Sequence, residues 1–203
     1  NELLRGEAIS NTLITELLGE ARRQGHRNVF LYTKPENERL FSSLSFRTVA
    51  RADKALMMET DRRGISGYCA YLTSLRRPGT AGAIVMHCNP VTRGHLHLIR
   101  TAAADVDTLY IIPVAEEGTR FPYTLRRQML VDATRDIPNV VVAEGSRYAV
   151  SRATFPSYFL KQADDATDTS ILLDLDIFKT HIAPALGATI RFAGTEPLDP
   201  LTS

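Results

Sequence analysis

Apolar residues in the first part of the chain follow a helical and then an extended spacing. Between Ile9 and Ala21 they recur every three or four residues, which predicts an amphipathic helix that ends before Gly25. A short apolar run at 29–32 predicts a strand, Pro35 opens a second predicted helix, and alternation over 46–58 predicts a β-hairpin. Helical spacing returns over 61–77 until the turn-forming sequence RRPGT interrupts it at 76–80, so we expect a domain boundary there.

From residue 81 onward, predicted strands and helices alternate. Strands are predicted at 83–88, 107–114, 140–142 and 189–193, and helices at 93–104, 124–134, 174–186 and, briefly, near 155–162. This alternation predicts an α/β fold, a doubly wound parallel sheet with helices on both faces. Ligands bind such sheets where the carboxyl ends of strands meet the N-termini of helices, and residues 87–95 form the first such junction.

Composition narrows the class of protein. The chain has 203 residues, 44% of them hydrophobic and 23% charged, and a net charge of +1, which gives no basic field for nucleic acid. No apolar run is long enough to span a membrane, and no signal peptide is evident. The two cysteines, Cys69 and Cys88, are too few for a disulfide scaffold and favour the cytoplasm. Because the chain opens without Met and enters a helix at once, we expect a segment of a longer protein.

The junction sequence HCNPVTRGH, at 87–95, allows three interpretations. A zinc site would use His87, Cys88, His95 and His97, but the first two point to opposite sides of a strand and the last two do not share a helical face. A plain turn would leave the strand through Asn89 and Pro90, with Thr92 capping the next helix. That interpretation does not explain a histidine in the exposed first turn.

A phosphate site explains the whole junction. The N-terminus of a helix presents unpaired N–H groups and a positive potential, both of which suit an anion. Gly94 removes a side chain where the anion must approach, and Thr92 and His95 can donate hydrogen bonds to it. The sequence therefore favours a phosphate-binding helix start over a metal site.

The motif Thr92-Arg93-Gly94-His95 after Asn89-Pro90 resembles the signature of the nucleotidylyltransferases. Further stretches narrow the likeness: FPY at 121–123 leading to Arg126, SRATFPSYF at 151–159, IAPALG at 182–187 and GTEP at 194–197 are similar to those of citrate lyase ligases. The resemblance implies a nucleotidylyltransferase domain, HxGH-type and Rossmann-like, over 81–203, incomplete at its C-terminal end.

Residues 6–46 resemble the second half of a Gcn5-related acetyltransferase domain, which precedes the nucleotidylyltransferase domain in this family. We therefore expect a partial acetyltransferase-like domain at 1–60 and a helix with a linker at 61–80. The upstream strands of such a domain are absent, so independent acetyltransferase activity is not expected.

The family resemblance implies activation of citrate lyase: ATP, acetate and the thiol form of the lyase give AMP, pyrophosphate and the acetyl form. The implied partners are acetate and the acyl carrier subunit of the lyase, without nucleic acid or membrane, and the implied cofactors are ATP and Mg²⁺. Two alternatives stay open, namely adenylylation of a phosphopantetheine-like acceptor and a non-catalytic module that binds the lyase.

The same resemblance assigns roles to residues. Thr92 and His95 are the expected catalytic residues, and Arg120 and Arg152 are candidate contacts to phosphate or acetate. The expected nucleotide-binding residues are Asn89, Pro90, Gly94, Arg126, Gly194, Thr195 and Glu196. A basic Ser/Thr-Arg segment that binds the triphosphate in related enzymes is expected beyond Ser203.

Overall fold

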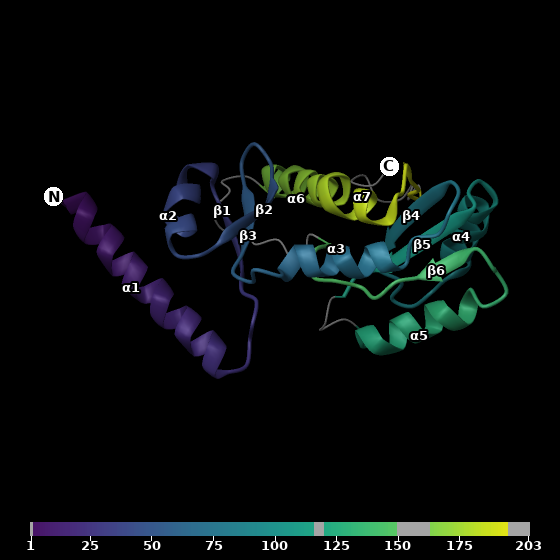
Figure 1. The fold of residues 1–203 in the computed structure, drawn as a ribbon, viewed down its shortest axis with the longest axis horizontal. Helices are drawn as coiled ribbons and strands as arrows, with labels where there is room; N and C mark the ends of the chain where they lie inside the picture. The colour runs from purple at the N-terminus through teal and green to yellow at the C-terminus, as the bar shows by residue number, and fades with distance from the viewer. Residues whose placement is uncertain (1, 116–119, 150–162, 195–203) are drawn as a thin grey trace. The chain divides into compact units, whose positions relative to one another are not determined.

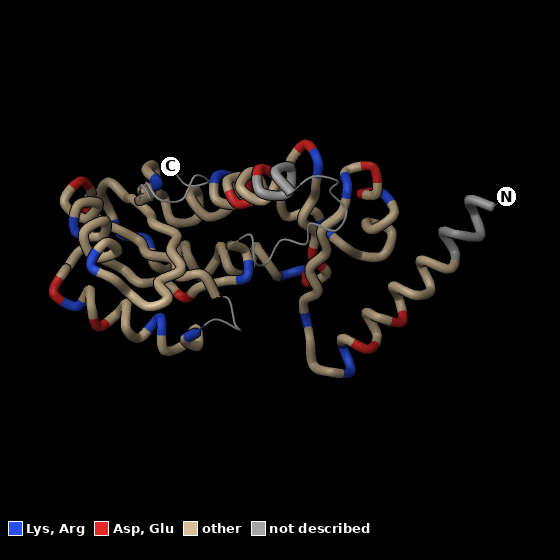
Figure 2. Tube along the Cα trace, turned by 180° about the vertical axis from the view of Figure 1, so that it is seen from behind, with Lys and Arg blue, Asp and Glu red and all other residues tan. Residues whose placement is uncertain are grey.

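The computed structural model describes residues 2–115, 120–149 and 163–194 and contains two compact units (Figure 1). Unit 1 comprises 1–67 and 150–177, and unit 2 comprises 68–149 and 178–203. The predicted domains at 1–60 and 81–203 stay a prediction. Within the described ranges, no helix is long and apolar enough to cross a membrane. Figure 2 shows Lys and Arg interspersed with Asp and Glu along the chain, and the full sequence has 24 of the former and 23 of the latter.

Unit 1 is built on a three-stranded antiparallel sheet. Its strands β1 (Phe30–Thr33), β2 (Arg47–Arg51) and β3 (Leu56–Glu59) lie in the order β1-β3-β2. The helices are α1 (Glu2–Arg23), the 3₁₀ helix η1 (Pro35–Asn37), α2 (Glu38–Ser43) and α6 (Ala163–Ile177). The predicted first helix, first strand and hairpin are confirmed, and α1 ends just before Gly25, whose φ is +86°.

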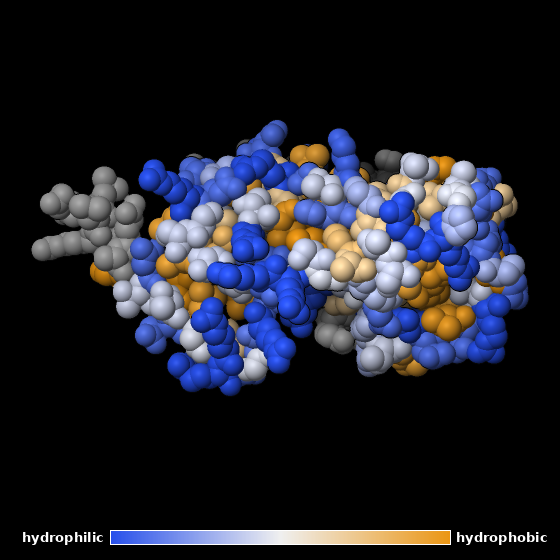
Figure 3. All heavy atoms as spheres, viewed as in Figure 1, coloured by the Kyte–Doolittle hydropathy of each residue, from blue (hydrophilic) through white to orange (hydrophobic). Residues whose placement is uncertain are grey.

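The core of unit 1 lies between α1 and this sheet. Ile14 and Leu18 of α1 pack against buried Phe46, Leu56 and Met58. A second apolar row on α1, made of Ile9, Leu13 and Leu17, stays more than half exposed. Apolar side chains on the face in Figure 3 occur in separate patches among hydrophilic ones.

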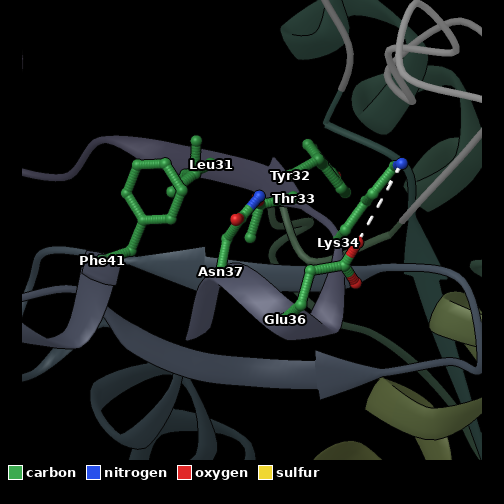
Figure 4. Close-up of a pocket in the computed structure, with 7 residues that line it drawn as sticks. All are labelled: Leu31, Tyr32, Thr33, Lys34, Glu36, Asn37 and Phe41. Atoms are coloured by element: carbon green, nitrogen blue, oxygen red, sulfur yellow. Dashed lines mark hydrogen bonds and ion pairs between the residues drawn. The ribbon is translucent and has the colours of Figure 1, made fainter. Parts of the chain in front are cut away.

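An open pocket of about 430 Å³ lies beside β1 and η1 (Figure 4). Its lining includes Lys34, whose Nζ lies 4.0 Å from a carboxylate oxygen of Glu36, and Asn37, whose amide donates to Thr33 Oγ1 at 3.1 Å. These polar side chains form two separate pairs, and the apolar part of the lining includes Leu31 and Phe41. The pocket contains none of the residues singled out by the sequence.

Unit 2 is the predicted parallel sheet. Its strands β4 (Ala81–Met86), β5 (Thr108–Pro113), β6 (Val140–Val142) and β7 (Ile190–Arg191) lie in the order β6-β5-β4-β7, and all neighbours are parallel. The chain runs from β4 outward to β5 and β6, and then returns to place β7 on the other side of β4. The strand order therefore reverses at β4, which makes its carboxyl end the switch point where ligands bind in such sheets.

Helices cover both faces of this sheet, as predicted. On one face, α4 (Arg93–Ala104) and α5 (Tyr123–Ala133) supply Ile99 and Leu130 to a cluster with Ile84 and Ile111. On the other face, the hydroxyl of buried Tyr110 donates to the carbonyl of Leu75, just after α3 (Gly64–Ser74). The π-helix η2 (Phe178–Ile182) and α7 (Ala183–Leu186) also belong to unit 2.

The element boundaries differ from the prediction mainly in the last helical stretch. Instead of one helix at 174–186, the chain forms α6, η2 and α7 in succession, and α6 begins at Ala163. The helix expected near 155–162 lies outside the described residues. The acetyltransferase-like character of the first part stays a prediction.

Candidate active site at the carboxyl end of strand β4

The turn that follows β4 leads directly into the helix α4. Cys88 is buried and has a φ of +45°, so the backbone leaves the strand through a left-handed residue. The Asn89–Pro90 peptide bond is cis. Thr92, in an extended conformation, then caps the helix that begins at Arg93. The predicted cap and helix start are confirmed.

Thr92 and His95 form a reciprocal cap at this helix start. The Thr92 hydroxyl oxygen accepts the His95 backbone N–H at 3.4 Å, and the His95 Nδ1 accepts the Thr92 backbone N–H at 3.0 Å. In the common capping box a Glu or Gln occupies the third helical position, and here a histidine does. Because Nδ1 accepts a hydrogen, a neutral ring carries its proton on Nε2. The cap thus fixes the tautomer and makes Nε2–H a hydrogen-bond donor.

The start of α4 has the electrostatic character of an anion site. The first N–H groups of a helix and its dipole favour negative charge, and Thr92, Arg93 and Gly94 are exposed. A Cβ added at Gly94 would lie 3.7 Å from Thr92 Oγ1, an ordinary contact. The fold itself therefore does not require glycine there, and the glycine leaves open space over the helix start.

The strand β7 brings a second segment to the same edge. Phe192 N–H donates to the Ala83 carbonyl at 2.9 Å, which continues the pairing of β7 with β4. A Cβ added at Gly194 would lie 3.7 Å from Leu98 Cδ2 on α4, so the chain after β7 runs beside α4. Thr195, Glu196 and Arg152 lie outside the described residues, and their predicted roles stay predictions.

Arg126 is buried beneath the turn, with 1% of its surface exposed. Its Nη1 donates to the carbonyls of His87, at 2.6 Å, and Val114, at 3.2 Å, and its Nε donates to the carbonyl of Phe121 at 3.1 Å. Arg120, in contrast, is exposed, and its guanidinium carbon lies 5.8 Å from the centre of the Phe121 ring. The Asn89 side-chain oxygen accepts the Phe121 N–H at 3.3 Å.

The metal interpretation gains no support from the geometry. Among the residues that the structure describes, no group of three or more His, Cys, Asp or Glu side chains could hold a metal ion. Burial raises the pKa of the Cys88 thiol to about 12, although the positive charge of Arg126 acts in the opposite direction. The Cys88 thiol is therefore protonated at neutral pH.

A group of tyrosines at the end of β6 escaped the sequence analysis. The hydroxyls of Tyr71 and Tyr123 accept the N–H groups of Glu144, at 2.8 Å, and Gly145, at 2.6 Å, while the Tyr68 hydroxyl donates to the Glu144 carbonyl at 2.9 Å. Burial raises the pKa of Tyr68 well above its ordinary value. The spacing of Tyr68 and Tyr71 on one predicted helix was the available signal, because residues three apart share a face. Their partner segment, far along the chain, could not be inferred from that spacing.

Comparison with known proteins relates this site to one family. Residues 81–203 match the family described as the citrate lyase ligase C-terminal domain. The citrate (pro-3S)-lyase ligase of Klebsiella pneumoniae is 44% identical over 98% of this chain and 59% of its own length, and that of Escherichia coli is 41% identical over 100% of this chain and 58% of its own. A phosphopantetheine adenylyltransferase of Streptococcus equi is 27% identical over 62% of this chain and 78% of its own length. The chain thus spans about three fifths of the curated citrate lyase ligases that it matches.

Proposed function

The chain belongs to the citrate lyase ligase family, and from that premise we propose that it activates citrate lyase by ATP-dependent acetylation. The reaction converts ATP, acetate and the thiol form of the lyase into AMP, pyrophosphate and the acetyl form. The observation that supports this proposal is the Thr92–His95 cap, which holds a threonine and a histidine at an exposed helix start at the switch point of the sheet.

In the first step, a carboxylate oxygen of acetate attacks the α-phosphorus of ATP. The bond from that phosphorus to the bridging oxygen breaks, and pyrophosphate leaves with the electron pair. Thr92 and the Nε2–H of His95 donate to the α-phosphate oxygens, where negative charge grows in the transition state. Such donors, fixed before the reaction, stabilise that charge without further reorganisation.

In the second step, the thiolate of the carrier attacks the carbonyl carbon of acetyl-adenylate, and AMP leaves. We propose that the thiol belongs to a prosthetic group on the acyl carrier subunit of the lyase. Gly194, Thr195 and Glu196, after β7, are proposed to contact the adenosine, while Arg120 and Arg152 are proposed contacts to phosphate or acetate. Asn89 and Pro90, in the turn after β4, are also proposed contacts to the nucleotide.

We propose that Mg²⁺, when bound with ATP, would supply positive charge that offsets the charge of the pyrophosphate. Mg²⁺ is commonly bound through substrate phosphates with few protein ligands. A location in the cytoplasm is also proposed, because ATP is available there and both cysteines, Cys69 and Cys88, are free thiols.

The test is the exchange of labelled pyrophosphate into ATP by the intact protein, with and without acetate. Exchange that requires both acetate and Mg²⁺ supports the proposal, and acetyl transfer to the carrier thiol, followed by mass spectrometry, completes it. Exchange that needs a phosphopantetheine-like acceptor and not acetate would instead indicate plain adenylyl transfer. Binding of the carrier without any exchange would indicate a non-catalytic module.

A further inference from the structure

Arg126 was expected from the sequence to contact the nucleotide, but its surroundings suggest another role. A guanidinium has five N–H groups, and three of them are committed here to backbone carbonyls. The three carbonyls belong to three separate segments: the turn after β4, the residue that follows β5 and a residue two positions before α5. An arginine that is 1% exposed and bonded in this way joins backbone segments together.

Two of these carbonyls lie just beyond the last paired residues of β4 and β5. The last residue pair between β4 and β5 joins Met86 with Pro113, and Val114 N–H still donates to the Met86 carbonyl at 3.0 Å. The His87 carbonyl lies one residue beyond that pairing, where the backbone turns away through Cys88. Arg126 Nη1 bridges this carbonyl and that of Val114, and so extends the connection between the two strands past the last pair.

Both backbone polar groups of Phe121 are hydrogen-bonded to side chains. Its carbonyl accepts from Arg126 Nε at 3.1 Å, and its N–H donates to the Asn89 side chain at 3.3 Å. Asn89 stands in the same turn that leads to Thr92 and His95. Two side chains therefore connect the turn after β4 with the segment before α5: Asn89 from the turn and Arg126 from α5.

We propose that Arg126 is a positioning residue, which fixes the turn after β4 so that Thr92 and His95 point at the α-phosphate, and that it does not bind the nucleotide itself. The inference rests on the proposed function for its catalytic consequence. Its structural part, that Arg126 sets the geometry of the Thr92–His95 cap, stands without any reaction. Lysine cannot replace it, because one ammonium group lacks the planar fork that reaches acceptors on different segments.

The activity test compares Arg126→Lys and Arg126→Ala with Arg127→Ala in the exchange assay. Arg127 is the matched control, since it is the next residue on α5 and its guanidinium pairs with Glu144 at 2.8 Å. Misplacement of reacting groups by about 1 Å costs on the order of 10²-fold in rate, so we expect a loss near that size in kcat for both Arg126 variants. The KM for ATP should change much less, and millimolar guanidinium ion should restore part of the activity of Arg126→Ala.

A different pattern would overturn the proposal. A rise in KM for ATP with kcat preserved would mean that Arg126 binds phosphate directly. Full activity in Arg126→Lys would mean that its positive charge suffices, and Arg126→Ala that melts like wild type yet is not rescued by guanidinium would exclude the positioning role.

A second measurement covers two further cases, an alanine variant that does not fold and a protein that shows no exchange. Nuclear magnetic resonance of the nucleotide-free protein reports the Thr92 amide proton and the tautomer of the His95 ring. Arg126→Lys should shift both signals, and Arg127→Lys should leave them in place. Unchanged signals in Arg126→Lys would refute the positioning role, whereas shifted signals in a protein without exchange would refute only the proposed reaction.

Discussion

The parallel sheet of unit 2 has polar groups at both of its edges, but the two edges arrange them differently. At the amino edge, the Asp107 carboxylate accepts the Thr80 N–H at 2.7 Å and the Thr80 hydroxyl at 2.8 Å, while the Thr80 hydroxyl oxygen accepts the Asp107 N–H at 3.0 Å. At the carboxyl edge, the cap of Thr92 and His95 lies at an exposed helix start above the buried Arg126. At the amino edge, Thr80 and Asp107 bond the starts of two strands to each other, whereas at the carboxyl edge the cap lies within an exposed helix start.

This contrast separates stability from function within a single sheet. Substitutions at the amino edge should lower the free energy of unfolding and leave the reaction intact. Substitutions of Thr92 and His95 at the carboxyl edge should mainly lower the reaction rate, because these side chains lie at an exposed helix start and not in the core. Each of the following substitutions lies at one of these two edges or serves as a control for one of them.

The largest effect is expected for His95→Ala. Removing a fixed donor to a developing negative charge typically costs about 10²–10³ in rate, and acetate-dependent exchange should fall by that factor. The melting temperature should fall only slightly, because the Thr92 hydroxyl still accepts a backbone N–H of the helix. His97→Ala, two residues further along α4 and exposed, is the control and should retain exchange. Exchange near the wild-type rate in His95→Ala would remove His95 from the mechanism.

Thr92 should contribute both to stability and to the exchange rate, so it is an exception to this separation. Thr92→Val keeps the shape of the side chain and removes the hydroxyl, which costs the cap about 0.5–2 kcal/mol of stability. It also removes a proposed phosphate donor, so exchange should fall by roughly tenfold or more. Thr92→Ser should keep most of both, as urea unfolding and exchange on the same samples would reveal. Equal losses in the Ser and Val variants would mean that the hydroxyl alone does not account for the role of Thr92.

Much of unit 2 was predictable because its signals are local. The apolar run of β4, the cap at Thr92 and the amphipathic α4 each follow from a few neighbouring residues, and the helix bounds of 93–104 were predicted correctly. Alternation of strands and helices then restricts the sheet to a parallel arrangement. The family followed from the motifs that these elements carry.

The structural features that the sequence did not predict depend on contacts between distant segments. The acceptors of Arg126 are backbone carbonyls, which no residue type in the sequence marks, so its bonds to three separate segments could not be inferred. The tyrosines around Glu144 met their partners only through the fold of the chain. The succession of α6, η2 and α7 likewise depends on packing, because helix periodicity alone does not mark where a π-helix interrupts it.

Gly79→Ala should disturb the amino edge through the backbone. Gly79 has a φ of +98°, and a Cβ there would come within 2.5 Å of Asp107 Oδ2. A side chain at positive φ costs roughly 1–2 kcal/mol, and the contact would also displace the Asp107 carboxylate. Urea unfolding should show this loss, while exchange well below the melting temperature should stay at the wild-type rate.

Gly67→Ala, inside α3, provides a control of opposite sign. A Cβ there would meet nothing closer than 3.7 Å, and alanine is the better helix former, so this variant should be slightly more stable. A fall in exchange for Gly79→Ala without unfolding would show that the amino edge influences the reaction, and the proposed division would be wrong.

The smallest effect is expected for Asp107→Asn, and it should depend on pH. Hydrogen bonds from the Thr80 N–H, and then from its hydroxyl, hold the pKa of Asp107 below its ordinary value. A folded-state pKa below the unfolded one means that the carboxylate stabilises the fold fully above the unfolded pKa. That stabilisation disappears as the pH falls through the folded value. Asparagine keeps an oxygen acceptor without the charge, so it should lower the melting temperature slightly at neutral pH.

The difference in melting temperature between wild type and Asp107→Asn should therefore close in acid, when both side chains are neutral. Asp107 is fully exposed, so salt should reduce the difference as well. Thr80→Val removes the hydroxyl partner, and in that background the Asp107→Asn substitution should cost less, since part of the charge-assisted bonding is already gone. A difference that persists below the folded pKa would show that the shape of the side chain, and not its charge, holds the amino edge together.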